Sequence, residues 1–259
     1  MKSLFINICS PLEQFYIIPL LEINLGAFSF YITNETVMLL IVFAFIIILV
    51  SAMRKPLTKS FYVIPTRLQL LFLYSYRAVG YLVSTNVGKK NGQKYFPIFF
   101  SLFWYIVLLN VLGLIPFSFT LTSHLIVTFA LSAMLFIAIN IIGFRKHGLK
   151  LFGLFFPDGT SFAISLLLVP IELLSYFFRP ISLSIRLFAN MMAGHTLLKV
   201  LAIFAWTIAH AAGFTAVLYF VPCIILIPLF ALEFVIAILQ AFVFVLLATV
   251  YLGDALNLH

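Results

Sequence analysis

The run from Ser182 to Lys199 reads SLSIRLFANMMAGHTLLK and holds four polar or charged side chains in an otherwise apolar segment. They are Arg186, Asn190, His195 and Lys199. An arginine at the centre of a membrane helix costs at least about 2.5–3.5 kcal/mol to insert, so a chain that keeps one has a use for the charge. The interpretation of the whole chain therefore depends on which group interacts with the Arg186 charge.

Composition assigns this segment to a membrane protein. The chain has 259 residues, of which 64% are hydrophobic and 8% are charged, and soluble globular domains do not have this composition. We therefore expect an all-α integral membrane protein that forms a single membrane domain over residues 1–259. The formal net charge of +8 comes from basic residues between hydrophobic runs, which fits the positive-inside rule rather than a nucleic-acid-binding face. Cys9 and Cys223 are too few and too far apart to predict a disulfide framework or a metal site.

Hydropathy divides the first half of the chain into spans and connections. Residues 1–34 are mixed in character and predict an extramembrane or interfacial segment, and the first span is expected at 35–54. Residues 65–87 combine polar and apolar side chains at helical spacing, which favours an amphipathic helix on the inner surface over the alternative of a further span. A hairpin of two spans is expected at 96–144. Polar turns are expected at 88–94 and 118–124.

Charges at the ends of these spans predict the orientation. Glu35 lies at the start of the first span, whereas Arg54 and Lys55 lie at its end. Arg145 and Lys146 follow the third span. Because basic residues collect on the side of negative potential, we expect the N-terminus outside and the C-terminus inside.

Residues 162–254 predict two long helices that fold back on each other near Gly213. Each helix has about 40 residues, whereas a perpendicular span needs about 20. The pair must therefore tilt strongly, bend, or leave the bilayer in part. The prolines of this region can kink or interrupt the helices.

The fold-back predicts which polar residues share a depth, because opposite residues of an antiparallel hairpin have numbers with a constant sum. A turn near Gly213 pairs Arg186 with Gln240, Glu172 with Asp254 and, within two residues, His195 with Glu233. At the helical rise, the His195 level lies about 10–14 Å outside the Arg186 level, and the Glu172 level lies about 21 Å inside it. His195 also falls about 180° from Arg186 around an ideal helix. This pattern predicts an outer carboxylate–imidazole pair, a central cation and an inner acid pair on two offset half-paths.

The same segment carries a resemblance to a known family. Together with NVLGLIPFSFTLTSH (110–124), LEFVIAILQAFV (232–243) and the ending YLGDALNLH (251–259), it is similar to subunit a of F-type ATP synthases. The resemblance covers nearly the whole chain from Pro11 onward, and His195 with the SPLEQF start resembles the mitochondrial form. It implies the F0 membrane stator of the mitochondrial inner membrane, which couples proton flow to rotation of the c-ring and to ATP synthesis. The fold it implies has one N-terminal span, a surface helix, a hairpin and two long tilted helices against the c-ring.

The resemblance also implies roles for single residues. Arg186 is expected to face the c-ring carboxylate and to separate the two half-channels. The expected proton pathway comprises Asn190, His195, Glu233 and Gln240 toward the intermembrane space, and Glu172 and Asp254 toward the matrix. The expected partners are the c-ring, the peripheral stalk, other small F0 subunits, membrane lipids and the transported proton. No nucleotide site, cofactor, metal or nucleic acid is expected for this subunit itself.

Other readings stay open at this point. A proton-coupled secondary transporter would use the intramembrane acids as a substrate site and predicts inverted repeats, which we do not find between residues 35–145 and 160–255. A purely structural anchor leaves the alignment of charges unexplained. Among single residues, Asn190 is also explained by helix packing, Glu172 by an interfacial acid, and Asp254 by a helix end. Arg179 is expected to bind lipid headgroups or backbone carbonyls, and Lys199 to extend toward the outer surface.

Overall fold

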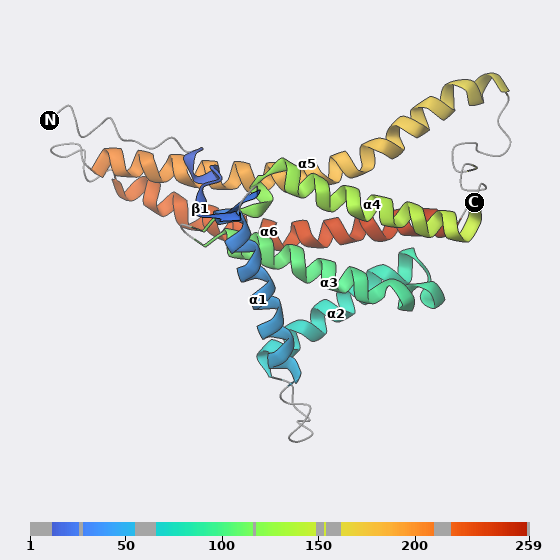
Figure 1. Ribbon diagram of the computed structural model, residues 1–259, viewed down its shortest axis with the longest axis horizontal. Coiled ribbons are helices and arrows are strands. Elements are labelled where there is room, and N and C mark those ends of the chain that lie inside the picture. Colours follow the sequence, from blue (N-terminus) through green and yellow to red (C-terminus); the bar gives the residue numbers. More distant parts are fainter. Residues whose placement is uncertain are drawn as a thin grey trace. The chain divides into compact units, whose positions relative to one another are not determined.

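The computed structural model describes residues 12–25, 28–54, 66–115, 118–148, 153, 162–209 and 219–257. The elements, drawn in Figure 1, are η1 (Glu13–Phe15), β1 (Pro19–Leu25), β2 (Phe28–Thr33), α1 (Asn34–Arg54), α2 (Arg67–Asn86), α3 (Lys89–Gly113), η3 (Leu121–Ser123), α4 (Leu125–His147), α5 (Phe162–Ala209) and α6 (Phe220–Leu256). The protein is therefore all-α apart from one two-stranded sheet.

Five of the described helices are long and apolar enough to cross a membrane, namely α1, α3, α4, α5 and α6. Helix α2 is not among them, as expected for an amphipathic helix. Helices α5 and α6 have 48 and 37 residues. Pro170 and Pro180 lie inside α5 and Pro228 lies inside α6 without interrupting either helix.

The chain folds as two compact units, each built from three separate stretches. Unit 1 comprises Met1–Ile46, Val107–His124 and Phe188–Leu239. Unit 2 comprises Ile47–Ile106, Leu125–Leu187 and Gln240–His259. The division falls between Leu187 and Phe188 in α5 and between Leu239 and Gln240 in α6.

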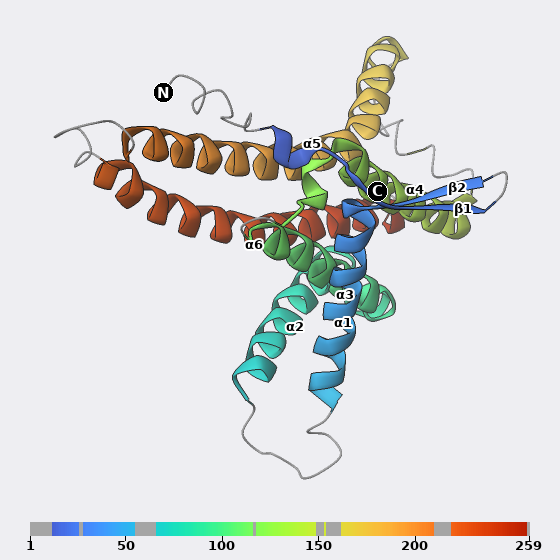
Figure 2. The same cartoon turned by 60° about the vertical axis from the view of Figure 1, so that its left-hand side comes forward.

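Unit 1 contains a β-hairpin that the sequence pattern did not predict. Strands β1 and β2 pair antiparallel and lie side by side in Figure 2. The side chain of Asn34, at the start of α1, accepts a hydrogen bond from the Ile18 amide at 3.2 Å and donates one to the Tyr16 carbonyl at 3.1 Å. These bonds fix the chain entering the hairpin against the helix that follows it.

In unit 2, α2 and α3 form a helical hairpin held by aromatic contacts. Phe72 stacks on Trp104 with ring centroids 4.2 Å apart, and Tyr76 meets Phe96 edge-on at 4.6 Å. The connection has only two residues, Val87 and Gly88, and the φ of 89° at Gly88 suits glycine. Helix α3 therefore begins at Lys89, and the predicted polar turn over 88–94 is wrong, because the polar residues after Gly88 continue as helix.

Helix α6 packs through a face of small residues in the interior. Ala241, Ala248 and Thr249 are fully buried, and small side chains of this kind let helix backbones approach closely. Asn86 of α2 donates a hydrogen bond from Nδ2 to the Thr249 hydroxyl at 2.9 Å. At the C-terminal end of α6, the Leu256 carbonyl oxygen lies 2.7 Å from Lys146 Nζ of α4, which donates to it. Unit 2 thus gathers the ends of α2, α4 and α6.

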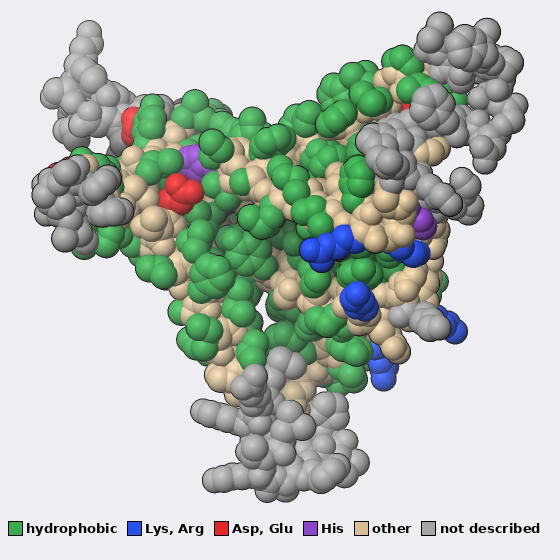
Figure 3. Space-filling model, turned by 45° about the vertical axis from the view of Figure 1, so that its right-hand side comes forward, with side chains coloured by type: hydrophobic (Ala, Val, Ile, Leu, Met, Phe, Trp, Pro, Cys, Tyr) green, Lys and Arg blue, Asp and Glu red, His purple; other side chains and the backbone are tan. Residues whose placement is uncertain are grey.

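The outer surface is apolar over the membrane-spanning helices. Hydrophobic side chains cover much of the face drawn in Figure 3. Ile47, Met134 and Ile227 are each about two-thirds or more exposed, at 67%, 71% and 70%. Exposed apolar surface of this extent marks contact with lipid or with protein partners.

Gly253 of α6 should be intolerant of a side chain. A Cβ at this position would lie 2.4 Å from the backbone carbonyl oxygen of Asn86, so the Gly253→Ala change must push two helices apart. We expect it to lower the free energy of unfolding by about 1–3 kcal/mol, measured as thermal unfolding of the purified chain in detergent. Gly80→Ala is the matched control, because its Cβ would meet Phe96 at an ordinary 3.6 Å. Equal stability of the two variants would contradict the packing described here.

Candidate functional site

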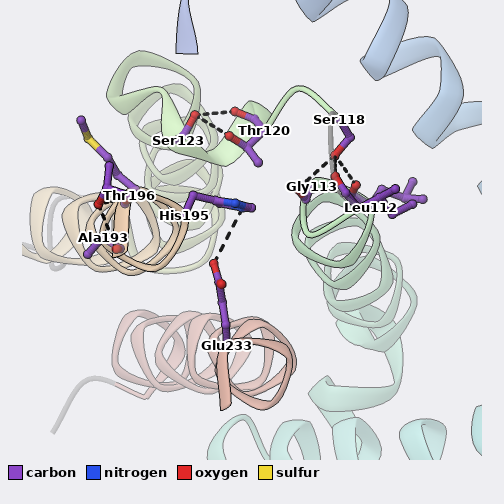
Figure 4. A network of polar contacts seen from close by, with 11 residues as sticks. Leu112, Gly113, Ser118, Thr120, Ser123, Ala193, His195, Thr196 and Glu233 are labelled. Atoms are coloured by element: carbon purple, nitrogen blue, oxygen red, sulfur yellow. Dashed lines mark hydrogen bonds and ion pairs between the residues drawn. The ribbon is translucent and has the colours of Figure 1, made fainter. Parts of the chain in front are cut away.

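In unit 1, α5 and α6 bring His195 and Glu233 together. His195 Nε2 lies 3.8 Å from Glu233 Oε1, and the two side chains are 14% and 7% exposed. This separation is longer than a hydrogen bond. Within the described residues, His195 Nε2 and both carboxyl oxygens of Glu233 are buried and make no hydrogen bond. Buried polar atoms with unused bonding capacity are rare and call for a functional or solvent partner. Figure 4 shows the two side chains pointing toward one another from facing helices.

Gly194, the residue before His195, makes room for the Glu233 carboxyl group. A Cβ at Gly194 would lie 2.4 Å from Glu233 Oε1 and 2.8 Å from its Cδ. The carboxyl group therefore rests against the backbone of α5, at a place where any side chain would displace it. The glycine in the AGH sequence thus has a packing reason, which the sequence pattern did not reveal.

Asn110 of α3 belongs to the same neighbourhood. It is fully buried, and its Nδ2 donates a hydrogen bond to the Ala237 carbonyl at 3.1 Å. Ala237 follows Glu233 by one helical turn of α6 and forms a buried apolar cluster with Leu114 and Met191. Asn110 Oδ1 makes no hydrogen bond within the described residues. One turn each of α3, α5 and α6 therefore meets here, with a spare amide oxygen among them.

The loop between α3 and α4 turns inward rather than facing solvent. Thr120, Thr122 and Ser123 are all buried, at 4%, 1% and 5% exposure. Thr120 Oγ1 donates to Ser123 Oγ at 2.8 Å, and Ser123 Oγ donates to the Thr120 carbonyl at 2.6 Å. Figure 4 shows these hydroxyl groups and His195 in one close view. The expected polar turn is present, but it forms part of the buried surroundings of unit 1.

Ser118 connects this loop to the end of α3. Its hydroxyl lies 2.8 Å from the Leu112 carbonyl, 3.0 Å from the Gly113 carbonyl and 2.7 Å from the Ile115 carbonyl. The last carbonyls of a helix have no partner inside the helix, and the single O–H donor of Ser118 lies within reach of those at this end of α3. Gly113 also allows a close approach, since a Cβ there would lie 3.0 Å from Thr120 Cγ2.

In unit 2, Arg186 lies exposed on α5. None of the residues that the structure describes forms an ion pair or a hydrogen bond with its guanidinium group. Gln240, predicted at the same level, is half-buried in the same unit, and the structure records no hydrogen bond between the two. Glu172 is also half-buried and has no recorded partner in the described chain.

The second arginine of α5 does have a partner. Arg179 Nη1 donates to Asp254 Oδ2 of α6 at 3.2 Å. The guanidinium carbon lies 5.2 Å from the Tyr176 ring centroid and 4.9 Å from the Tyr251 ring centroid. Tyr176 OH in turn donates to Asn140 Oδ1 of α4. The expectation that Arg179 binds lipid headgroups or backbone carbonyls is therefore corrected, because a carboxylate of its own chain lies within reach.

The same contact corrects the predicted level of Asp254. The sequence pairing set Asp254 opposite Glu172, whereas the structure sets it opposite Arg179, seven residues further along α5. The ends of α5 at Ala209 and of α6 at Phe220 place the centre of the hairpin slightly beyond Gly213, which accounts for less than half of this seven-residue difference.

The candidate residues divide between the two units. Asn190, His195 and Glu233 lie in unit 1, with Asn190 half-buried on α5. The remaining candidates lie in unit 2, namely Glu172, Arg186, Gln240 and Asp254. No group of three or more His, Cys, Asp or Glu that could hold a metal ion occurs in the described part of the chain.

Comparison with known proteins agrees with the resemblance seen in the sequence. A family model described as "ATP synthase A chain" matches residues 36–253. Proteins named "ATP synthase subunit a" are 44% identical in Chondrus crispus, over all of both chains, and 42% identical in Brassica napus, over 96% of this chain and 97% of that one. The protein of that name in Rhodospirillum rubrum is 44% identical over 96% of this chain and 99% of its own length. Because the match extends along essentially the whole sequence, this chain belongs to the ATP synthase A chain family.

Proposed function

We propose that this chain is the proton-translocating stator subunit of an F-type ATP synthase. In this proposal it forms two offset proton half-channels against the rotating c-ring and couples proton flow to rotation and ATP synthesis. Membership of the family supports the stator role. The distribution of charged groups in the two units supports the finer proposal of two half-channels.

The observation that carries the proposal is the exposure of Arg186 on a membrane-spanning helix. An arginine facing lipid is costly unless something meets it. No described residue of this chain pairs with Arg186, whereas Arg179 on the same helix has an acid from its own chain. A charge left open at such a cost fits a partner outside the chain, and a carboxyl group on a passing rotor is the partner with the required charge.

The proposed mechanism follows from the cost of charge in lipid. A carboxyl group surrounded by lipid favours its neutral form, because desolvation penalises the ionised one. Arg186 reverses this preference for the rotor carboxyl beside it, since an opposite charge at short range stabilises the ionised form. The released proton leaves by the inner route, which contains Glu172 and Asp254. The fixed cation also repels any proton that would pass between the routes without the rotor turning.

The outer route is proposed to supply the next proton through His195 and Glu233, with Asn190 and Gln240 as further polar groups. His195 Nε2 and both carboxyl oxygens of Glu233 make no hydrogen bond within the described residues. This unused capacity suits exchange with water and with a passing proton. We add Asn110 of α3. Its buried amide donates a hydrogen bond to the Ala237 carbonyl, which lies one helical turn along α6 from Glu233. Asn110 cannot carry a proton itself, but its amide oxygen can orient a hydrogen-bonded chain.

We propose the mitochondrial inner membrane as the location, with the N-terminus toward the intermembrane space and the C-terminus in the matrix. The relatives include a protein from Rhodospirillum rubrum, so the location is drawn from His195 and the SPLEQF start rather than from the family. The basic last turn of α4 supports this orientation. Lys146 in that turn bonds to Leu256, which supports the C-terminal end lying on the same side. The proposed partners are the c-ring, the peripheral stalk, other small F0 subunits and lipids.

Replacing Arg186 tests the proposed function. In the assembled complex, Arg186→Ala should lower ATP synthesis and ATP-driven proton pumping by at least about a hundredfold, because the rotor carboxyl loses the counter-charge proposed to keep it ionised. Arg186→Lys should also be strongly impaired, since a lysine lacks the planar, delocalised charge of arginine. Assembly, followed on native gels, should be retained.

Lys199→Ala is the matched control, because it removes another cation of α5 for which the described structure records no partner. It should leave both activities within about twofold of the parent, as surface charge changes usually do. Proton pumping that survives Arg186→Ala unchanged would contradict the stator function. Solute transport by the purified chain in vesicles would instead favour a transporter.

Gly194→Ala tests the outer route without removing any charged group. The new Cβ must displace the Glu233 carboxyl group, which lies 2.4 Å from its position. Because a shift of about 1 Å in a reacting group can cost up to a hundredfold in rate, we expect ATP synthesis to fall by about tenfold or more. Thermal stability should change little, since alanine favours the helix by about 1 kcal/mol over glycine. An active Gly194→Ala enzyme would show that the position of Glu233 is unimportant.

A further inference from the structure

We propose that Arg179 is a positioning residue for the inner proton route and that Asp254 acts as its fixed counter-charge rather than as a proton carrier. Glu172 is then the exchanging acid of that route. This inference rests on the proposed function above. It changes the role of Asp254 within it and assigns one to Arg179.

The first step is the geometry around Arg179. Its guanidinium group contacts Asp254 Oδ2 at 3.2 Å and lies near two aromatic rings, at 5.2 Å from Tyr176 and 4.9 Å from Tyr251. A guanidinium group over aromatic faces is attracted by both rings, and it prefers a planar, fixed orientation. Tyr176 is itself tied to Asn140 of α4. Groups from α4, α5 and α6 therefore hold the ion pair in place.

The second step is the position of Arg179 along α5. Glu172, Arg179 and Arg186 follow one another at intervals of seven residues. Each interval is nearly two full turns, so successive residues are offset by about 20° and form one stripe along the helix. At the helical rise, Arg179 lies about 10 Å from each of the other two along the helix axis. A proton moving between the levels of Arg186 and Glu172 must pass the level of Arg179.

The third step is electrostatic. An unpaired cation beside a route of low dielectric repels a passing proton strongly. Asp254 cancels that charge at Arg179, so the pair is neutral as a unit and the route stays open. The carboxyl oxygen that bonds to Arg179 is at the same time committed to a fixed partner. Glu172, which has no recorded partner among the described residues, stays available to exchange protons.

Arg186 and Arg179 thus differ in what they meet. Arg186 is exposed without a partner in the described chain, whereas Arg179 is 29% exposed in its side chain and faces Asp254. One arginine of the stripe is open to the rotor, and the other is neutralised within the chain. Only the open arginine can separate the two routes by its net charge.

The test compares single and double neutral variants in the assembled ATP synthase. Arg179→Gln and Asp254→Asn each leave one unpaired charge beside the route, so each should lower ATP synthesis by about threefold to tenfold. The double variant restores a neutral pair and should recover at least half of the parental rate. Arg179→Lys keeps the ion pair and should also recover most of the activity.

Arg77→Gln on α2 is the matched control, because it makes the same change in charge at an exposed position of the same unit. It should leave synthesis within about twofold of the parent. Subunit incorporation, measured by immunoblot of the isolated complex, normalises every rate to assembled enzyme.

Two results would overturn the inference. A double variant as impaired as Asp254→Asn alone would mean that Asp254 carries protons itself. Parental rates in both single variants would mean that the pair has no part in the route. Arg186→Ala is measured in parallel: if it stays active, the proposed function fails as a whole, whereas an inactive Arg186→Ala with an unrescued double variant rejects only the role of Arg179.

Discussion

A charged side chain in a membrane span is costly without a partner, because lipid offers none and desolvation penalises the bare charge. This constraint organises the long helices α5 and α6. Glu233 lies against His195 and against the backbone at Gly194, and Asp254 lies against Arg179. Arg186 remains without a partner in the described chain. The two arginines of α5 therefore differ, because Arg179 is paired within the chain and Arg186 has no partner among the described residues.

Close approach of backbones makes these contacts possible. Gly194 leaves space for a carboxyl group from α6, and Gly253 lets α6 meet the backbone of Asn86. Without a hydrophobic driving force between helices in lipid, small residues supply the packing that joins them. Gly194 therefore makes the approach of Glu233 to α5 possible, and Gly253 makes the packing of α6 against the end of α2 possible. The candidate residues lie on α5 and α6, and each of these helices contributes residues to both compact units.

The sequence could predict what depends on local composition. Apolar runs set the spans, because crossing lipid requires about 20 apolar residues whatever their neighbours are. The meeting of His195 with Glu233 was also predictable, because a turn near Gly213 already sets them within two residues of the same level. The partner of Asp254 was not, since it contacts Arg179, two helical turns along α5 from Glu172, and the ends of α5 and α6 account for only part of that shift. Asn110 stood out only as one polar residue in a span.

By itself, the sequence determined that this is a membrane protein of five long apolar helices and one amphipathic helix, and that Arg186 lies within a span. Hydropathy and charge act residue by residue, so they need no knowledge of the fold. Only the tertiary structure decided which polar groups touch, that the loop around Thr122 is buried, and that Arg179 is neutralised while Arg186 is open. These outcomes depend on helix rotation, on the length of a turn and on the space left by single glycines, and contacts between distant segments set all three.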